Sequence, residues 1–254
     1  MHYFEPMLLL IFADVDWIRT KQEVKNIAIR LEECFNEEPQ ESCIHLLQKE
    51  ILSKKIRFPL LEELSVHLVD VLPKEKQISF CDAVMALNEM GSSVIAGKLL
   101  QLRLAEDYLN SLNKAVNYIS ESDEWYVCDH IAERVQGVAL LTQPDKTIPY
   151  LKKLLAHENP MAVRSVGVAT HYAVKKGLSR DHAEQMLQLL LQMAEAKHYH
   201  IKTGVGWGAK TIVKFYPELA GKYKSQLEAD RVGQWFKTKI KIGLGRSGKY
   251  ARRD

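Results

Sequence analysis

Trp125 and Asp129 lie four residues apart in the stretch DEWYVCDHIAER, which otherwise has the pattern of an amphipathic helix. This spacing places the carboxylate beside the indole on one helix face. We predict Ser122 as the N-cap, so that Asp129 is about the seventh helical residue, too deep to serve as a cap. Two interpretations stay open: Trp125 packs between helices and Asp129 is solvated or ion-paired, or the two side chains form a site.

Arg164 is a second residue of interest, in the stretch NPMAVRSVGVA. An arginine among valines requires an anion, and its planar guanidinium suits Asp129, another carboxylate or a phosphate equally well.

The stretch GVGWGAKTIVKF carries a third group, in which Trp207, Lys210 and Lys214 share one helical face. Glycines flank the tryptophan at Gly204, Gly206 and Gly208. They are no dinucleotide-binding loop, because no strand is predicted before them. Close approach of a ligand and close packing of a neighbouring helix explain them equally well.

Helices must position these residues, since apolar residues recur at spacings of three and four along nearly the whole chain. Asn159, Pro160 and Gly177 predict the start and stop of one helix, Ser179 caps the next, and a third begins near His200. Short turns between such helices indicate an all-α fold, an α-solenoid of about six HEAT-like repeats of roughly 40 to 47 residues with a concave groove. A compact helical bundle is the alternative.

Charged residues are distributed unevenly along the 254 residues of the chain. Residues 1–158 hold 17 Lys and Arg against 25 Asp and Glu, a balance of −8, whereas residues 159–254 hold 18 against 7, a balance of +11. A basic half indicates a polyanion such as nucleic acid, or a merely solvated surface. We predict one domain, residues 1–254, ending in a flexible basic tail at residues 243–254.

Other classes of site have little support. Cys34, Cys43, Cys81 and Cys128 form no CxxC motif, so we expect no zinc site, no disulfides and a reducing cytoplasm. His198 and His200 lack further ligands for a metal. The apolar run from Met7 to Phe12 is too short to span a membrane and is a poor signal peptide.

Taken in order, three stretches resemble the AlkD-like DNA alkylation repair family, bacterial glycosylases built from HEAT-like repeats. WYVCD is similar to the family's W-x-x-x-D, NPMAVRSVGVA to its N-P-W-x-R-R-A, and IKTGVGWGAK to its I-x-K-A-x-G-W. IRFPLLEEL from Ile56 is a weaker match, so the resemblance covers roughly Ile56 to the C-terminus.

The resemblance implies a glycosylase that excises cationic purines such as 3-methyladenine and 7-methylguanine from double-stranded DNA in base excision repair, with no cofactor. Asp129 would stabilise the oxocarbenium-like transition state and orient the water, with the face of Trp125 against the cationic base or sugar. Arg164 would clamp a flanking phosphate and Trp207 would form the other wall of the cleft. Lys202, Lys210 and Lys214 would contact the DNA backbone. We expect a monomer.

The chain departs from the family at two positions: Val163 stands for the first arginine and Met161 for the tryptophan of the second motif. Two other functions therefore stay open. One is a non-catalytic relative that binds distorted or branched DNA, and the other is a helical-repeat adaptor for proteins.

Overall fold

The computed structural model describes residues 16–252 and divides the chain into two compact units, residues 1–95 and 96–254. The short apolar run from Met7 to Phe12 lies outside the described residues. The boundary falls within helix α5 (Met90–Arg103). Whether the chain acts as one domain stays a prediction.

In its described residues, 16–95, unit 1 consists of helices and one small parallel sheet, in which Trp17 pairs with Lys55 and Ile18 with Ile56. A capping box starts α1: Thr20 accepts from the backbone of Glu23, whose carboxylate accepts from the backbone of Thr20. Helix α1 packs against α2 and α3. The elements are β1 (Trp17–Ile18), α1 (Lys21–Glu37), α2 (Gln40–Leu47), the π-helix η1 (Gln48–Leu52), β2 (Lys55–Ile56), α3 (Phe58–Val71), the 3₁₀-helix η2 (Lys74–Lys76) and α4 (Gln77–Ala86).

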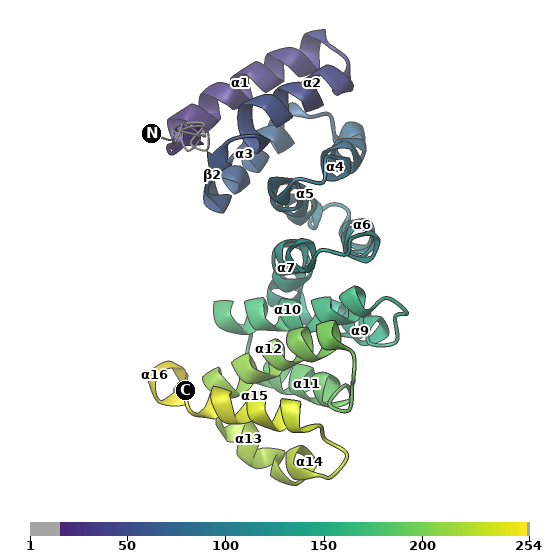
Figure 1. Ribbon diagram of the computed structural model, residues 1–254, viewed down its shortest axis with the longest axis vertical. Helices are drawn as coiled ribbons and strands as arrows, with labels where there is room; N and C mark the ends of the chain where they lie inside the picture. Colours follow the sequence, from purple (N-terminus) through teal and green to yellow (C-terminus); the bar gives the residue numbers. More distant parts are fainter. Residues whose placement is uncertain (1–15, 253–254) are drawn as a thin grey trace, which may run out of the picture. The chain divides into compact units, whose positions relative to one another are not determined.

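Unit 2 is built from helices alone in its described part, and α10 and α12 form its centre. Helix α10 packs against α7, α8 and α12, and α12 packs in turn against α15. Figure 1 shows α10, α12 and α15 side by side. The helices are α6 (Tyr108–Glu121), α7 (Trp125–Arg134), α8 (Gln136–Thr142), α9 (Pro144–Leu154), α10 (Pro160–Lys176), α11 (Arg180–Leu191), α12 (Tyr199–Phe215), α13 (Glu218–Lys222), α14 (Lys224–Glu228), α15 (Gln234–Leu244) and α16 (Ser247–Tyr250).

A structural repeat runs through unit 2 and can be measured from its side-chain hydrogen bonds. Four bonds join residues 38 to 40 positions apart, about the distance from a helix to its counterpart in the next helical pair. The all-α helical-repeat class predicted from the sequence is confirmed, and the repeats here lie at or just below the short end of the predicted length. The bonded pairs are Tyr108 with Thr147, Arg164 with Thr203, His171 with Thr211 and Tyr216 with Leu178.

The predicted limits of the central helices are confirmed. The Asn159 side chain accepts from the backbone of Met161 at 2.8 Å and Pro160 is the first residue of α10. Gly177 ends α10 with a φ of 124°, which favours glycine. The Ser179 side chain caps α11 by accepting from the backbone of His182.

The predicted start of α7 is wrong, because this helix begins at Trp125. Helix α6 extends to Glu121 and Ser122 is its C-cap, so three extended residues are needed before the chain can turn into α7. The Ser122 hydroxyl accepts from the backbone of Glu124 at 3.1 Å instead of capping α7. Asp129 is thus the fifth residue of the helix, still too deep to be a cap.

The described part of the predicted tail folds against unit 2. Residues 247–250 form α16, and the Arg252 guanidinium donates to the carbonyl oxygens of Val174 and Leu178. The mobility predicted for residues 243–254 stays a prediction.

Candidate active site in unit 2

Asp129 and Arg164 form a bidentate ion pair between α7 and α10. Arg164 Nε donates to Asp129 Oδ1 and Nη2 donates to Oδ2, both at 3.0 Å. The side chains are 14% and 8% exposed, respectively. Arg164 Nη1 also donates to Thr203 Oγ1 on α12, so the guanidinium links three helices of unit 2. The carboxylate of Asp129 is therefore held in one orientation, and its side chain is not wholly buried.

Two opposing effects act on the Asp129 carboxyl. Burial raises its pKa, and the adjacent Arg164 guanidinium lowers it by charge and by hydrogen bonding. Burial is the larger effect, so the pKa lies above its ordinary value. The adjacent Arg164 guanidinium thus favours the ionised form of this carboxyl against the effect of burial.

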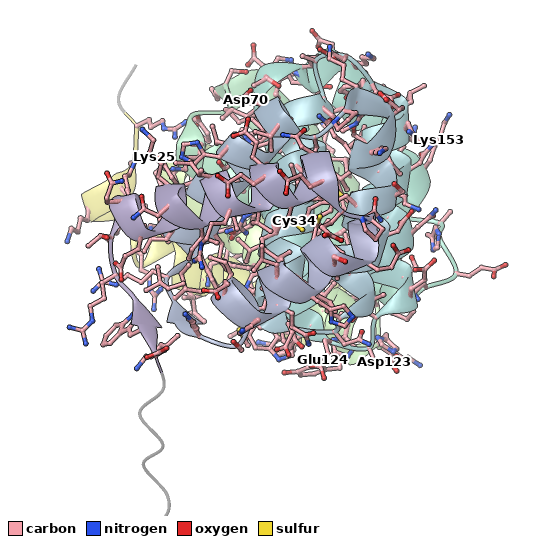
Figure 2. All side chains as sticks on the ribbon, turned by 90° about the horizontal axis from the view of Figure 1, so that it is seen from above. Lys25, Cys34, Asp70, Asp123, Glu124 and Lys153 are labelled. Carbon is pink, nitrogen blue, oxygen red and sulfur yellow. The ribbon has the colours of Figure 1, made fainter. Side chains whose placement is uncertain are left out.

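Trp125 lies one turn before Asp129 and exposes 54% of its surface. It does not pack between helices, which was one of the two interpretations of its place in the sequence. Asp123 and Glu124, just ahead of it, also project outward (Figure 2). An exposed indole next to a buried carboxylate can meet a ligand with its face.

Two further residues near the pair were not predicted as part of the site. Tyr199 begins α12, four residues before Thr203, and is 68% exposed. The next residue, His200, has its pKa lowered by burial and then by Arg164. Its Nδ1 is buried and finds no hydrogen-bond partner among residues 16–252. In the sequence, His198 and His200 suggested only a metal site, and Tyr199 between them was not singled out.

Trp207 stacks on His171, a residue of α10 that the sequence analysis did not single out. Their ring centroids are 4.0 Å apart with an interplanar angle of 25°. Trp207 follows Thr203 by one turn on α12, and His171 follows Arg164 by two turns on α10. The stacked rings thus lie on α10 and α12, the helices that carry Arg164 and its partner Thr203.

A cluster of cations lies beyond the stacked rings. Burial lowers the pKa of Lys210, and the charges of Lys239, Arg246 and Lys214 lower it further. Lys210 and Lys214 were predicted as DNA-backbone contacts. Lys239, on α15, and Arg246, in the predicted tail, join them. Lys202 is half-buried on the same helix. Cations that lower one another's pKa form a surface that favours an anionic ligand.

Glycines bring α10 and α12 into close contact. A Cβ on Gly204 would lie 2.5 Å from the Arg164 carbonyl oxygen, and one on Gly167 would lie 2.1 Å from the Gly204 carbonyl oxygen. Gly208 faces Gly167 in the same way, at 2.7 Å from its carbonyl oxygen. Helix packing therefore explains Gly204 and Gly208, and this packing lets Arg164 reach Thr203.

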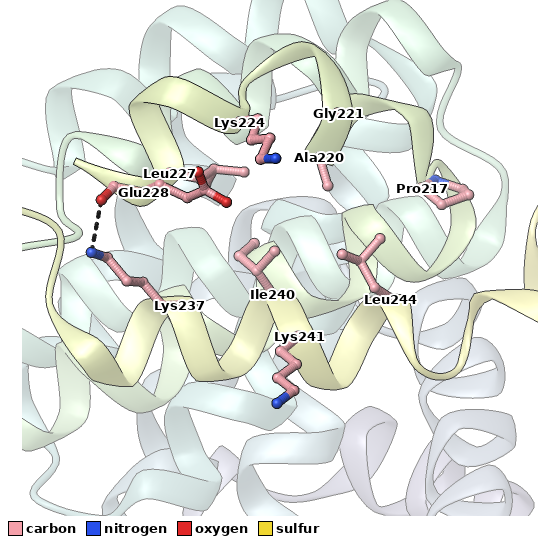
Figure 3. Close-up of a pocket in the computed structure, with 10 residues that line it drawn as sticks. All are labelled: Pro217, Ala220, Gly221, Lys224, Leu227, Glu228, Lys237, Ile240, Lys241 and Leu244. Atoms are coloured by element: carbon pink, nitrogen blue, oxygen red, sulfur yellow. Dashed lines mark hydrogen bonds between the residues drawn. The ribbon is translucent and has the colours of Figure 1, made fainter.

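Other parts of the described chain offer different features. A cavity of about 380 Å³ lies between α13, α14 and α15 and contains none of the predicted site residues (Figure 3). Within residues 16–252, no group of three histidine, cysteine or acidic side chains could hold a metal ion. In the same range no helix is long and apolar enough to cross a membrane.

Comparisons with known proteins bear on the family and the fold of the chain. A family model described as DNA alkylation repair enzyme matches residues 28–226, well over half of the chain. No curated protein matches the sequence. The crystal structure of smu.31 from Streptococcus mutans UA159 is similar over 90% of this chain and 100% of that chain, with a TM-score of 0.60 and 14% identity. At that identity the likeness shows the fold alone.

Proposed function

This chain belongs to the DNA alkylation repair enzyme family, and we propose that it is a DNA glycosylase that excises cationic N-alkylated purines by hydrolysis of the N-glycosidic bond. The observation that carries the proposal is the Asp129 carboxylate, buried and held by Arg164 beside the exposed ring of Trp125. Purines of the 3-methyladenine and 7-methylguanine type are the substrates we propose.

The chemistry needs one well-placed negative charge. Alkylation gives the base a positive charge and makes it a good leaving group, so protonation by a general acid adds little. As the bond breaks, positive charge develops on the deoxyribose, and a fixed carboxylate stabilises it. Asp129 supplies that carboxylate and orients the attacking water, while the face of Trp125 attracts the cationic base or sugar.

Arg164 acts in two ways in this proposal. It fixes the orientation of the Asp129 carboxylate through the two bonds at 3.0 Å. A guanidinium has five N–H donors, of which Arg164 uses three on Asp129 and Thr203. We propose that Arg164 also holds a phosphate flanking the lesion, the clamp predicted from the family resemblance.

DNA is held by the rest of the site. Trp207 forms the second aromatic wall, and Lys202, Lys210 and Lys214 neutralise phosphates. The pKa lowering of Lys210 by its cationic neighbours supports this role, because a phosphate would relieve their mutual repulsion. A monomer, a cytoplasmic location and the absence of a cofactor stay predictions.

The alternative function is a DNA-binding relative without base excision. It is favoured by Val163 and Met161, which replace the family's arginine and tryptophan and are only 2% and 5% exposed. Neither side chain reaches solvent, so this chain has one cation and one aromatic ring fewer to present to DNA. Binding without catalysis would use the same lysines.

Base release separates the two functions. The test is release of 7-methylguanine from a duplex oligonucleotide under single-turnover conditions at low salt, with salt-dependent binding measured on the same duplex. Release well above the rate of spontaneous depurination supports the glycosylase. Tight binding with no release from 7-methylguanine or 3-methyladenine supports the non-catalytic relative.

A further inference from the structure

His171 has no role in the proposed chemistry, yet its ring stacks directly on Trp207, a residue of the candidate site. Its ring is nearly parallel to the indole of Trp207, at 4.0 Å between centroids. Stacked rings at this distance stabilise one another beyond the area they bury. Trp207 is only partly buried, and the stack on His171 restrains its ring.

Hydrogen bonds determine the orientation of the His171 ring. Its Nδ1 lies 2.8 Å from Thr211 Oγ1, and the Thr211 hydroxyl donates its single hydrogen to the Trp207 carbonyl oxygen at 2.9 Å. Since that hydrogen is already used, Thr211 Oγ1 accepts from His171. The proton of the neutral imidazole is therefore on Nδ1, and Thr211 links the backbone of Trp207 to the ring that stacks on it.

The surroundings of His171 keep its ring uncharged. Burial lowers its pKa to about 3, and Lys175, Lys210 and Lys214 add to the effect by charge. A protonated imidazole here would add another cation to the lysines and weaken stacking through repulsion within the cluster. The neutral ring instead provides an apolar face among cations.

We propose that His171 is a positioning residue that holds the indole of Trp207 in one plane, so that a nucleotide meets a preformed aromatic wall. Preorganisation of this kind lowers the conformational entropy lost on binding. That His171 holds the Trp207 indole is a statement about the free protein alone. The effect of this stack on DNA binding rests on the proposed function.

The stack of His171 on Trp207 can be tested in the free protein without any DNA. Indole NMR resonances are assigned with Trp207→Phe, and the His171 ring is followed by its nitrogen shifts from pH 5 to 8. We expect the Nδ1–H tautomer and no titration in this range. Titration near pH 6.5, or a proton on Nε2, would overturn the proposal.

Three variants separate the ring from its hydrogen bond. His171→Phe keeps a stacking ring, His171→Ala removes it, and Thr211→Val removes only the bond that orients it. Acrylamide quenching of Trp207 should increase clearly in His171→Ala, slightly in Thr211→Val, and little in His171→Phe. If His171→Ala does not fold, Thr211→Val and His171→Phe still test the proposal. Quenching of Trp207 that is equal in the native protein and in both variants would contradict the orienting role of the Thr211 hydrogen bond.

The effect on DNA is measured with the same variants. His171→Ala should weaken binding of duplex DNA about three- to tenfold, the range expected for one aromatic contact, and His171→Phe should restore it. In a base-release assay the change should appear in KM rather than in kcat, because Trp207 positions the nucleotide and does not stabilise the developing charge. If the native protein releases no base, the proposed function fails while the NMR and quenching results still decide the role of His171.

Discussion

Removing Arg164 while Asp129 remains is the most informative perturbation of the ion pair. In Arg164→Met the carboxylate keeps its burial, at 14% exposure, but loses both guanidinium bonds. Breaking a buried pair from one side destabilises a protein by about 3–5 kcal/mol, because an uncompensated charge stays behind. We expect the lower end of that range, about 3 kcal/mol, because the Asp129 side chain is not wholly buried.

The double variant Asp129→Asn/Arg164→Met tests the reason for this loss. Asp129→Asn removes the buried negative charge that Arg164→Met leaves without a partner. The double variant should therefore be more stable than Arg164→Met alone. The two substitutions should show a coupling free energy of about 2 kcal/mol. Urea unfolding followed by tryptophan fluorescence reports mainly on unit 2, which contains Trp125, Trp207 and Trp235.

The pH dependence provides a second check. Burial raises the pKa of Asp129, and the loss of Arg164 removes the effect that opposed it. A carboxyl whose pKa is higher in the folded than in the unfolded state binds more protons when folded, so stability falls as pH rises through its titration. Arg164→Met should therefore lose stability from pH 4 to 7 more steeply than the native protein. Additive substitutions with parallel pH profiles would refute the buried-charge explanation.

Three further predictions concern DNA contacts and helix packing. Lys210→Gln/Lys214→Gln should reduce the slope of log Kobs against log salt for duplex binding by about 1.8, roughly 0.9 for each lost phosphate contact; an unchanged slope would exclude both lysines from the interface. Gly204→Ala should destabilise unit 2 by about 1–3 kcal/mol in urea unfolding, because its Cβ would lie 2.5 Å from a carbonyl oxygen. The matched Gly221→Ala, whose Cβ meets nothing within 4 Å, should be neutral or stabilising, and equal effects would contradict the packing of α10 on α12. Asn159→Ala should cost about 1 kcal/mol by loss of the cap on α10, measured in the same way.

Local signals in the sequence predicted most of the helices around the site. Asn159, Pro160 and Gly177 act through their own backbone, so their meaning can be read without knowing the fold. Ser122 misled because it lies between two helices, where it ends α6 and its side chain does not cap α7. A serine before acidic residues predicts a helix start only if the preceding helix has already ended.

Contacts between repeats could not be predicted from the sequence. Arg164 suits a carboxylate and a phosphate equally well, and only the packing of α7 on α10 brings Asp129 to it. His171 reaches Trp207 across about one repeat, and no residue type or spacing marks that contact in advance. Arg246 belonged to the predicted tail, and only tertiary packing brings it and Lys239 of α15 beside Lys210.

The most direct test of the proposed function is single-turnover release of 7-methylguanine from duplex DNA at low salt by three proteins: the native chain, Asp129→Asn and Asp123→Asn. Asp123 is an exposed acid just before the same helix and serves as the control. We expect release by the native protein and Asp123→Asn, and a rate at least about tenfold lower in Asp129→Asn, equal to roughly 1.4 kcal/mol of barrier. Full activity in Asp129→Asn would place the catalytic charge elsewhere and contradict the role assigned to the ion pair.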